Sequence, residues 1–250
     1  MRVLFPHLKT YFSFSKKENL HIWVSAIIFA FILNFRKWGE GTFDLSQGIS
    51  NLIFAFIVVV IGMYFHISIQ KIIAVYLGYK AEHSFWLNGL LLCLVIAFMS
   101  NGFIPLLFFG TIKVEHLEKL RLGKFRYGLN YRDLAVTSVA GPIASLLLVL
   151  ITAFFYLPTE APALLRIINI NLALAFFALL PIPTVKAARL GEGGTAGFNI
   201  LYYSRALYVF CLASVIVYYL LITIAKFSSL IVAFIFAGMC TYVFIKRIEE

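Results

Sequence analysis

Long apolar segments, separated by shorter polar stretches, make up most of this chain. Seven of them approach the length of about 20 residues that a helix needs to cross a lipid bilayer. They lie at residues 22–35, 50–70, 87–110, 134–157, 164–183, 206–225 and 228–245. The pattern therefore predicts a helical membrane protein with up to seven spanning segments.

The third segment differs from the others because polar and helix-breaking residues interrupt it. Ser100, Asn101, Gly102 and Pro105 leave an apolar arm of about 13 residues, which is too short to span a bilayer. We therefore expect residues 87–112 to form a re-entrant hairpin that enters and leaves the membrane on the same side. Its non-helical part would have to pack against the helix bundle, because lipid cannot hydrogen-bond to exposed backbone.

The distribution of Lys and Arg favours the hairpin, because these residues concentrate in cytoplasmic loops. With seven spans and a cytoplasmic N-terminus, 8 of the 21 basic residues would face the cytoplasm. With six spans and the hairpin, 17 would face the cytoplasm and 4 would not. We therefore predict an all-α polytopic membrane protein with six transmembrane helices, one re-entrant hairpin and both termini cytoplasmic.

The amino-acid composition also indicates a membrane protein, and it limits the kinds of partner that the protein can bind. Of the 250 residues, 62% are hydrophobic and 13% charged, whereas soluble domains have roughly 25% charged residues. Basic residues at the cytoplasmic ends of helices explain the net charge of +10, so we expect the lipid bilayer and no nucleic acid as a partner. We expect residues 1–21 to form a cytoplasmic or interfacial segment without a cleavable signal peptide, and residues 22–250 to form a single membrane domain.

Three stretches place polar or helix-breaking residues inside the apolar pattern. Residues 63–71 read MYFHISIQK, residues 139–148 read VAGPIASLLL and residues 169–190 read NINLALAFFALLPIPTVKAARL. In this order they resemble the site-2 protease family of intramembrane zinc metalloproteases, over about residues 50–225. The resemblance implies an HExxH helix that binds zinc, then an AGP helix, then a helix that ends in LPIPPLDG and supplies the third zinc ligand from its Asp.

The positions that would carry the chemistry hold other residues here. The HExxH motif reads HISIQ from His66 to Gln70, so Ile67 replaces the general base and Gln70 replaces the second histidine. Lys186 stands where the resemblance places the Asp ligand, and a protonated Lys cannot bind zinc. A single histidine, His66, is too few for catalytic zinc, which ordinarily has three protein ligands. We therefore expect no metal and no cofactor.

Lys186 has two possible roles in this altered site. Its ammonium group could bond to the side-chain carbonyl of Gln70 in a polar latch that replaces the metal. Alternatively, its long side chain could extend toward the cytoplasmic interface, in which case no partner inside the membrane is needed.

Four further residues are candidates for a cleft that binds a client protein. Asn169 and Asn171 are candidates because an Asn of this region helps to hold the substrate in the related proteases, and their alternative role is hydrogen bonding between helices. Gly141 and Pro142 are the other two, and their ordinary role would be close helix packing at the start of a span.

The resemblance implies a catalytically inactive homologue that binds or regulates transmembrane or membrane-associated protein clients. One alternative is a structural subunit of a larger membrane complex, in which the altered site is packed interior. Another is an active zinc metalloprotease that recruits unusual ligands such as Glu82 or His83. Otherwise we expect His83 and His116 to lie in solvated cytoplasmic loops. A cleft open to lipid between the helices with His66 and Lys186 would favour client binding, and a filled one would favour the structural subunit.

Overall fold

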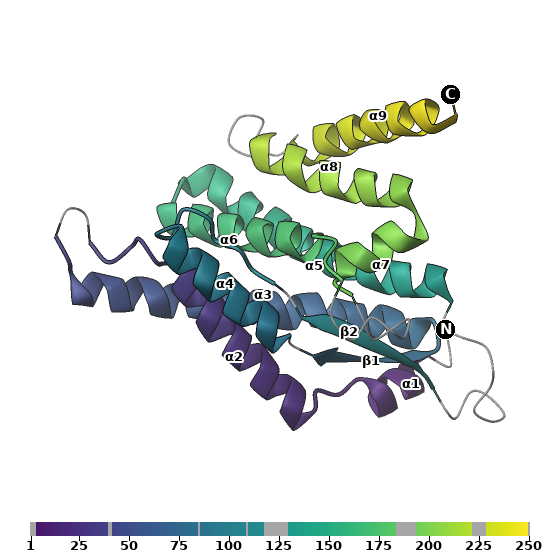
Figure 1. Ribbon diagram of the computed structural model, residues 1–250, viewed down its shortest axis with the longest axis horizontal. Helices are drawn as coiled ribbons and strands as arrows, with labels where there is room; N and C mark the ends of the chain where they lie inside the picture. The colour runs from purple at the N-terminus through teal and green to yellow at the C-terminus, as the bar shows by residue number, and fades with distance from the viewer. Residues whose placement is uncertain are drawn as a thin grey trace.

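The computed structural model describes residues 4–39, 42–84, 86–108, 110–117, 130–183, 194–221 and 229–249 (Figure 1). Within these residues it contains nine helices and one two-stranded sheet. The helices are α1 (Leu4–Tyr11), α2 (Lys16–Leu33), α3 (Leu45–Tyr76), α4 (Leu87–Met99), α5 (Tyr131–Thr159), α6 (Pro162–Ala178), α7 (Ala196–Tyr203), α8 (Arg205–Leu221) and α9 (Ser229–Glu249). The strands are β1 (Tyr79–Ser84) and β2 (Thr111–His116).

All seven apolar segments contain a helix, as the sequence predicts. Two helices are long and apolar enough to cross a membrane, namely α3 and the Tyr131–Tyr156 part of α5. Four shorter apolar helices, with 10–17 residues, lie at Leu87–Met99, Pro162–Ala178, Arg205–Leu221 and Val232–Lys246. The mainly helical character is therefore confirmed, while the six-span topology stays a prediction.

The prediction of an all-α fold is wrong between α3 and α5, where the chain forms a small sheet. β1 and β2 pair in antiparallel fashion, with Ala81 opposite Val114 and His83 opposite Ile112. Along β1, buried and half-buried residues alternate, as expected for a strand with one covered face. The prediction placed these residues in a loop between two apolar segments.

The segment predicted as a re-entrant hairpin has only one helical arm. α4 covers 13 residues and is followed by Ser100 as its C-cap, close to the predicted interruption. The N–H of Gly102 bonds to the oxygen of Ala97 at 2.7 Å, and Asn101 and Gly102 have φ angles of 49° and 72°. These are the features of a Schellman cap, which turns the chain out of the helix. Residues 103–108 continue without a helix, and the chain then enters β2.

α3 is the central helix of the bundle and contacts α2, α5, α6 and β1 (Figure 1). One hydrophobic core joins α2, α3, α4 and α6 and includes the buried Phe29, Met63 and Leu174. A second core joins α5, α6 and α8 and includes Val149 and Val215. Both faces of α6 are therefore covered, and the helix lies between the two cores.

α5 and α6 form a tight antiparallel pair. Only Glu160 and Ala161 separate the two helices. Glu160 has a left-handed φ of 47°, its N–H bonds to the oxygen of Tyr156 at 2.8 Å, and Pro162 is the first residue of α6. A left-handed residue ends a helix and a proline at its first position starts one, so the local sequence explains the sharp reversal.

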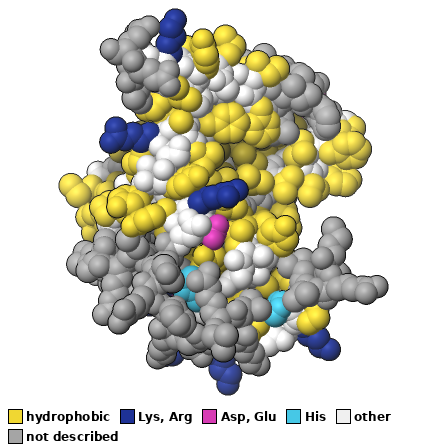
Figure 2. Space-filling view, turned by 90° about the vertical axis from the view of Figure 1, so that its right-hand side faces the viewer, with side chains coloured by type: hydrophobic (Ala, Val, Ile, Leu, Met, Phe, Trp, Pro, Cys, Tyr) yellow, Lys and Arg dark blue, Asp and Glu magenta, His cyan; other side chains and the backbone are white. Residues whose placement is uncertain are grey.

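Large apolar side chains cover much of the outside of the helices. On α3, Ile53, Ile57 and Ile61 recur every fourth residue and are each more than half exposed. Figure 2 shows one face of the molecule on which hydrophobic side chains occupy much of the described surface. Apolar surface of this extent marks contact with a membrane or with another protein.

Candidate functional site

His66 and Gln70 lie one turn apart on the face of α3 that meets α5, and each is only 2% exposed. Nδ1 of His66 is 2.9 Å from Oγ of Ser145. Nε2 of Gln70 donates to the backbone oxygen of Ser138 at 3.4 Å. Both contacts join α3 to α5, so the two polar positions of the first motif take part in bonds between helices.

Pro142 explains why the carbonyl group of Ser138 is available to Gln70. In a regular α-helix this carbonyl would accept a bond from the N–H of residue 142, and proline has no N–H. The prediction that Pro142 stands at the start of a span is wrong. Helix α5 begins at Tyr131, after the N-cap Asn130, and Pro142 lies in its interior. The proline therefore serves the contact between α3 and α5.

Gly141 allows the two helices to approach closely at the same place. A Cβ atom on residue 141 would overlap Nε2 of His66 and Nε2 of Gln70. Because glycine has no Cβ, the backbone of α5 lies directly against both side chains. The first and second motifs thus meet in the structure, and close packing is the role of Gly141.

Ile67 occupies the position that the resemblance assigns to the general base. Its side chain is 1% exposed and belongs to the hydrophobic core shared by α2, α3, α4 and α6. A hydrocarbon side chain cannot take up a proton, and here it contributes to core packing.

A small cavity of about 20 Å³ lies beside these residues. Side chains from α3, β1, α5 and α7 line it, namely His66, Gln70, His83, Ser138 and Asn199. Nδ2 of Asn199 donates to Oγ of Ser138 at 3.1 Å, while the buried Nε2 of His83 has no hydrogen-bond partner among the described residues. The volume and the polar lining suit one water molecule. The described part of the chain contains no group of three His, Cys, Asp or Glu side chains that could hold a metal ion.

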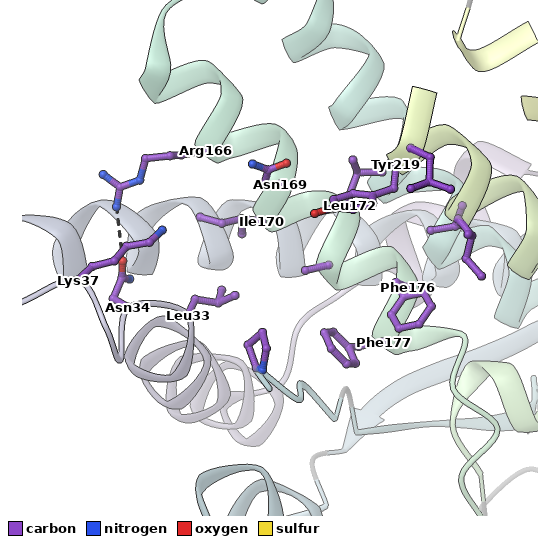
Figure 3. A pocket seen from close by; sticks show the side chains of 15 residues that line it. Leu33, Asn34, Lys37, Arg166, Asn169, Ile170, Leu172, Phe176, Phe177 and Tyr219 are labelled. Carbon is purple, nitrogen blue, oxygen red and sulfur yellow. Dashed lines mark hydrogen bonds between the residues drawn. The ribbon is translucent and has the colours of Figure 1, made fainter. Parts of the chain in front are cut away.

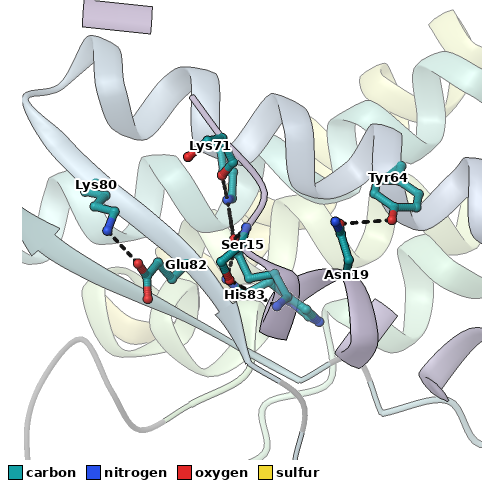
Figure 4. Close-up of polar contacts among 9 residues, drawn as sticks. Ser15, Asn19, Tyr64, Lys71, Lys80, Glu82 and His83 are labelled. Carbon is teal, nitrogen blue, oxygen red and sulfur yellow. Dashed lines mark hydrogen bonds and ion pairs between the residues drawn. The ribbon is translucent and has the colours of Figure 1, made fainter. Parts of the chain in front are cut away.

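Glu18 is a buried residue that joins α2, α3 and β1 near this cavity. Figure 4 labels its partners Ser15, Lys71 and His83. Oε1 of Glu18 lies 2.7 Å from Nζ of Lys71 and accepts the backbone N–H of His83 at 2.7 Å. Its Oε2 accepts the N–H of Ser15 at 2.8 Å, as part of a capping box at the start of α2. Nζ of Lys71 also donates to the oxygen of Ser13 at 2.7 Å.

The sequence did not reveal this cluster, because Glu18 falls in the predicted N-terminal segment (residues 1–21) and Lys71 directly follows the predicted span at residues 50–70. The letters SKKE at 15–18 are a capping-box signal that would have placed a helix start there. The expectation that His83 and His116 lie in solvated loops is also wrong, since both lie on strands and His83 is 5% exposed. Burial lowers the pKa of His83 to about 4, although the Glu18 carboxylate acts in the opposite direction.

The two asparagines of the third motif lie on different sides of α6. Asn171 is 2% exposed, and its Nδ2 donates to the oxygen of Ile167 at 3.0 Å. A Cβ on Gly62 of α3 would approach Oδ1 of Asn171 to 2.8 Å, so this side chain lies in the contact between α3 and α6. Asn169 is exposed and lines a separate cavity of about 410 Å³. Lys186 lies outside the described residues, and the polar latch therefore stays a prediction.

Comparison of the chain with protein-family models, with curated proteins and with solved structures gave no match. The residues and contacts of the chain itself therefore carry the assignment of function.

Proposed function

We propose that this chain is a catalytically inactive homologue of site-2 proteases that binds a transmembrane protein client in the bilayer without cleaving it. The long apolar helices and their exposed isoleucines support a place in the membrane. Ile67 and Gln70 at the positions of the general base and second ligand argue against hydrolysis, because neither can perform the required step.

The observation that carries the proposal is the outer edge of β2, with which no strand of the described residues pairs. Leu117 donates its N–H to Gly78, so the register directs the N–H groups of Lys113 and Glu115 toward β1. The N–H groups of Ile112 and Val114 then point to the other edge, with which no described strand pairs. Ile112 also lines the His66 cavity. An extended client segment can add to such an edge by main-chain hydrogen bonds.

The alternative of an active zinc enzyme that recruits unusual ligands such as Glu82 or His83 has little geometric support. Neighbouring residues of a strand point to opposite faces, so these two side chains do not converge on one ion. Glu82 instead pairs with Lys80 at 2.6 Å, while His83 faces the interior.

A structural subunit of a larger membrane complex is the second candidate. It is favoured by the close packing around His66, since this side chain is 2% exposed and the adjoining cavity holds about one water molecule. In that case the β2 edge would contact a permanent partner subunit.

The test uses the full chain in nanodiscs with a panel of fluorescent single-span peptides that contain a helix-breaking residue. We expect saturable energy transfer to a label on the chain and no new peptide termini by mass spectrometry, with or without added zinc. Ile112→Pro should weaken binding at least tenfold, because it removes an outward N–H without touching the pairing with β1. Ile112→Val is the matched control and should bind as the unchanged chain does.

Two outcomes would overturn the proposal. Cleavage that disappears on His66→Ala and on addition of a chelator would establish an active protease. Failure of every peptide to bind, or equal binding by the Ile112→Pro and Ile112→Val variants, would favour the structural subunit.

A further inference from the structure

A second cavity lies away from the His66 site, between the end of α2, α6 and α8 (Figure 3). It measures about 410 Å³, which is within the range of pockets that bind small molecules. Its walls are mainly apolar and include Leu33, Phe176 and Phe177. Tyr219 and Leu220 of α8 also line it and are more than half exposed, so this wall continues into the apolar surface of the protein.

One end of this cavity is cationic. Lys37 and Arg166 line it, and both also line an adjoining pocket of about 300 Å³. The adjoining pocket adds the guanidinium group of Arg36 and the side-chain amides of Gln47 and Asn51. Figure 3 shows Lys37 and Arg166 close together at one end of the cavity and the aromatic rings at the other. The apolar cavity and the basic pocket therefore adjoin at the positive charges of Lys37 and Arg166.

These charges have no acidic partner in the part of the chain that the structure describes. The ion pairs found there join Lys71 to Glu18 and Lys80 to Glu82, and no carboxylate from the described residues lines either pocket. Cations at or near membrane depth are costly unless an anion or a hydrogen-bond acceptor compensates them. The two pockets are thus arranged for a negative group.

Neutral amides hold Arg166 in place. Its Nη1 donates to Oδ1 of Asn51 at 2.8 Å and its Nη2 donates to Oδ1 of Asn34 at 3.4 Å, while its buried Nε has no partner among the described residues. The guanidinium also lies over the ring of Phe54, with its carbon 4.8 Å from the ring centre. These contacts fix the orientation of the group without neutralising it.

Lys37 supports the same conclusion. Burial and the nearby charge of Arg166 both lower the pKa of its ammonium group. An anion between the two side chains would relieve their mutual repulsion.

The topology predicted from the distribution of basic residues agrees with a dedicated site. It leaves only Arg36, Lys37, Arg166 and Lys226 outside the cytoplasmic face. Three of these four residues line the basic pocket. Most of the basic residues that the predicted topology places outside the cytoplasmic face therefore line one pocket.

We propose that the paired pockets bind an anionic phospholipid, with an acyl chain in the apolar cavity and the phosphate held by Arg166 and Lys37. Arginine suits phosphate because its planar group donates two parallel hydrogen bonds. A spanning segment of a client would match the apolar walls, and it offers no negative group to the cations. The inference stands independently of client binding at β2.

The experiment measures lipid binding to the full chain in detergent by native mass spectrometry, with phosphatidylglycerol and phosphatidylcholine of identical acyl chains. We expect about one tightly held phosphatidylglycerol per chain and at least a tenfold preference over phosphatidylcholine. Arg166→Gln and, separately, Lys37→Gln should reduce this preference to threefold or less. Lys37→Gln guards against misfolding of the Arg166 variant, because it leaves the bonds of Arg166 to the asparagines in place.

Two controls separate the site from general attraction. Arg205→Gln removes an exposed charge at the start of α8 and should keep the full preference. Ala173→Trp fills the apolar cavity and should weaken phosphatidylglycerol binding about tenfold, with the charges unchanged.

Equal binding of the two lipids by the unchanged chain would overturn the proposal. So would an unchanged preference in both the Arg166→Gln and Lys37→Gln variants. Displacement of the lipid by millimolar inorganic phosphate alone, together with normal binding by the Ala173→Trp variant, would reduce the site to a phosphate site. Loss of preference in the Arg205→Gln variant would assign the effect to net charge.

Discussion

Lys71 and Glu18, 53 residues apart in the sequence, form a buried ion pair in which Nζ and Oε1 are 2.7 Å apart. The two side chains are only 3% and 4% exposed. The pair fixes the start of α2 against α3 and, through the N–H of His83, against the sheet.

We expect Glu18→Gln to lower the free energy of unfolding by about 3 kcal/mol, because it leaves the Lys71 ammonium buried without its counterion. The double variant with Lys71→Met should lose less than the sum of the two single changes, since no unpaired charge remains. Denaturant titration in a mild detergent measures all three. Glu82→Gln breaks the exposed pair with Lys80 and should cost less than about 1 kcal/mol. Equal losses for Glu18→Gln and Glu82→Gln would contradict the role of the buried ion pair.

Gly141→Ala should destabilise the protein by about 2 kcal/mol or more, because its methyl group would overlap the side chains of His66 and Gln70. Gly238→Ala on α9 is the matched control, because a Cβ there meets no atom within 4 Å. Thermal unfolding in detergent should show a lower midpoint for the first variant and an unchanged or slightly higher one for the second. A rise in the midpoint of the Gly141 variant would refute the close approach of α5 to α3.

The buried His83 should make stability depend on pH. The folded side chain stays neutral down to about pH 4, whereas in the unfolded chain it takes up a proton near pH 6.5. The unfolded state therefore binds more protons between these values, so stability should fall as the pH drops from 6.5 toward 4, by up to about 3 kcal/mol. Glu18, His21 and Lys71 are the neighbouring groups whose charges act on His83.

Unfolding midpoints measured between pH 8 and pH 4.5 test this dependence. His83→Gln should make the curve less steep, and His7→Gln on α1 should leave it as it is in the unchanged chain. Parallel curves for all three proteins would assign the pH dependence to other groups.

Ser145→Ala should cost about 1 kcal/mol, because it removes the hydroxyl that bonds to Nδ1 of the buried His66. Ser50→Ala changes an exposed position on α3 and should be nearly neutral. The same denaturant titration compares them. If the two variants are equally stable, the hydroxyl of Ser145 contributes nothing measurable to the contact between α3 and α5.

The sequence was sufficient to predict the helices of the seven apolar segments, because these segments are long and strongly apolar. It did not predict α1 and α7, which have only eight residues each. The sequence also placed the end of α4 near Ser100, since Asn101 and Gly102 tolerate the left-handed backbone that a helix cap requires. The sheet was missed because β1 and β2 have only six residues each and are separated by 26 residues along the chain, so neither forms a pattern alone.

The candidate site was predicted in part. The contact of Gly141 with His66 and Gln70 agrees with the order of motifs in the resemblance, although the distances between helices cannot be read from spacing. The role of Pro142 depends on the helix starting at Tyr131, which the polar residues before residue 134 obscured. Lys71 pairs with a residue 53 positions away, and only the folded chain brings such residues together.

The two-residue turn at Glu160 and Ala161 holds α5 and α6 together as one antiparallel pair. Arg166 lies on α6 near this turn, and Gly141 of α5 packs against His66. One helix pair therefore supplies both a cation of the basic pocket, Arg166, and the glycine that lies against His66, Gly141.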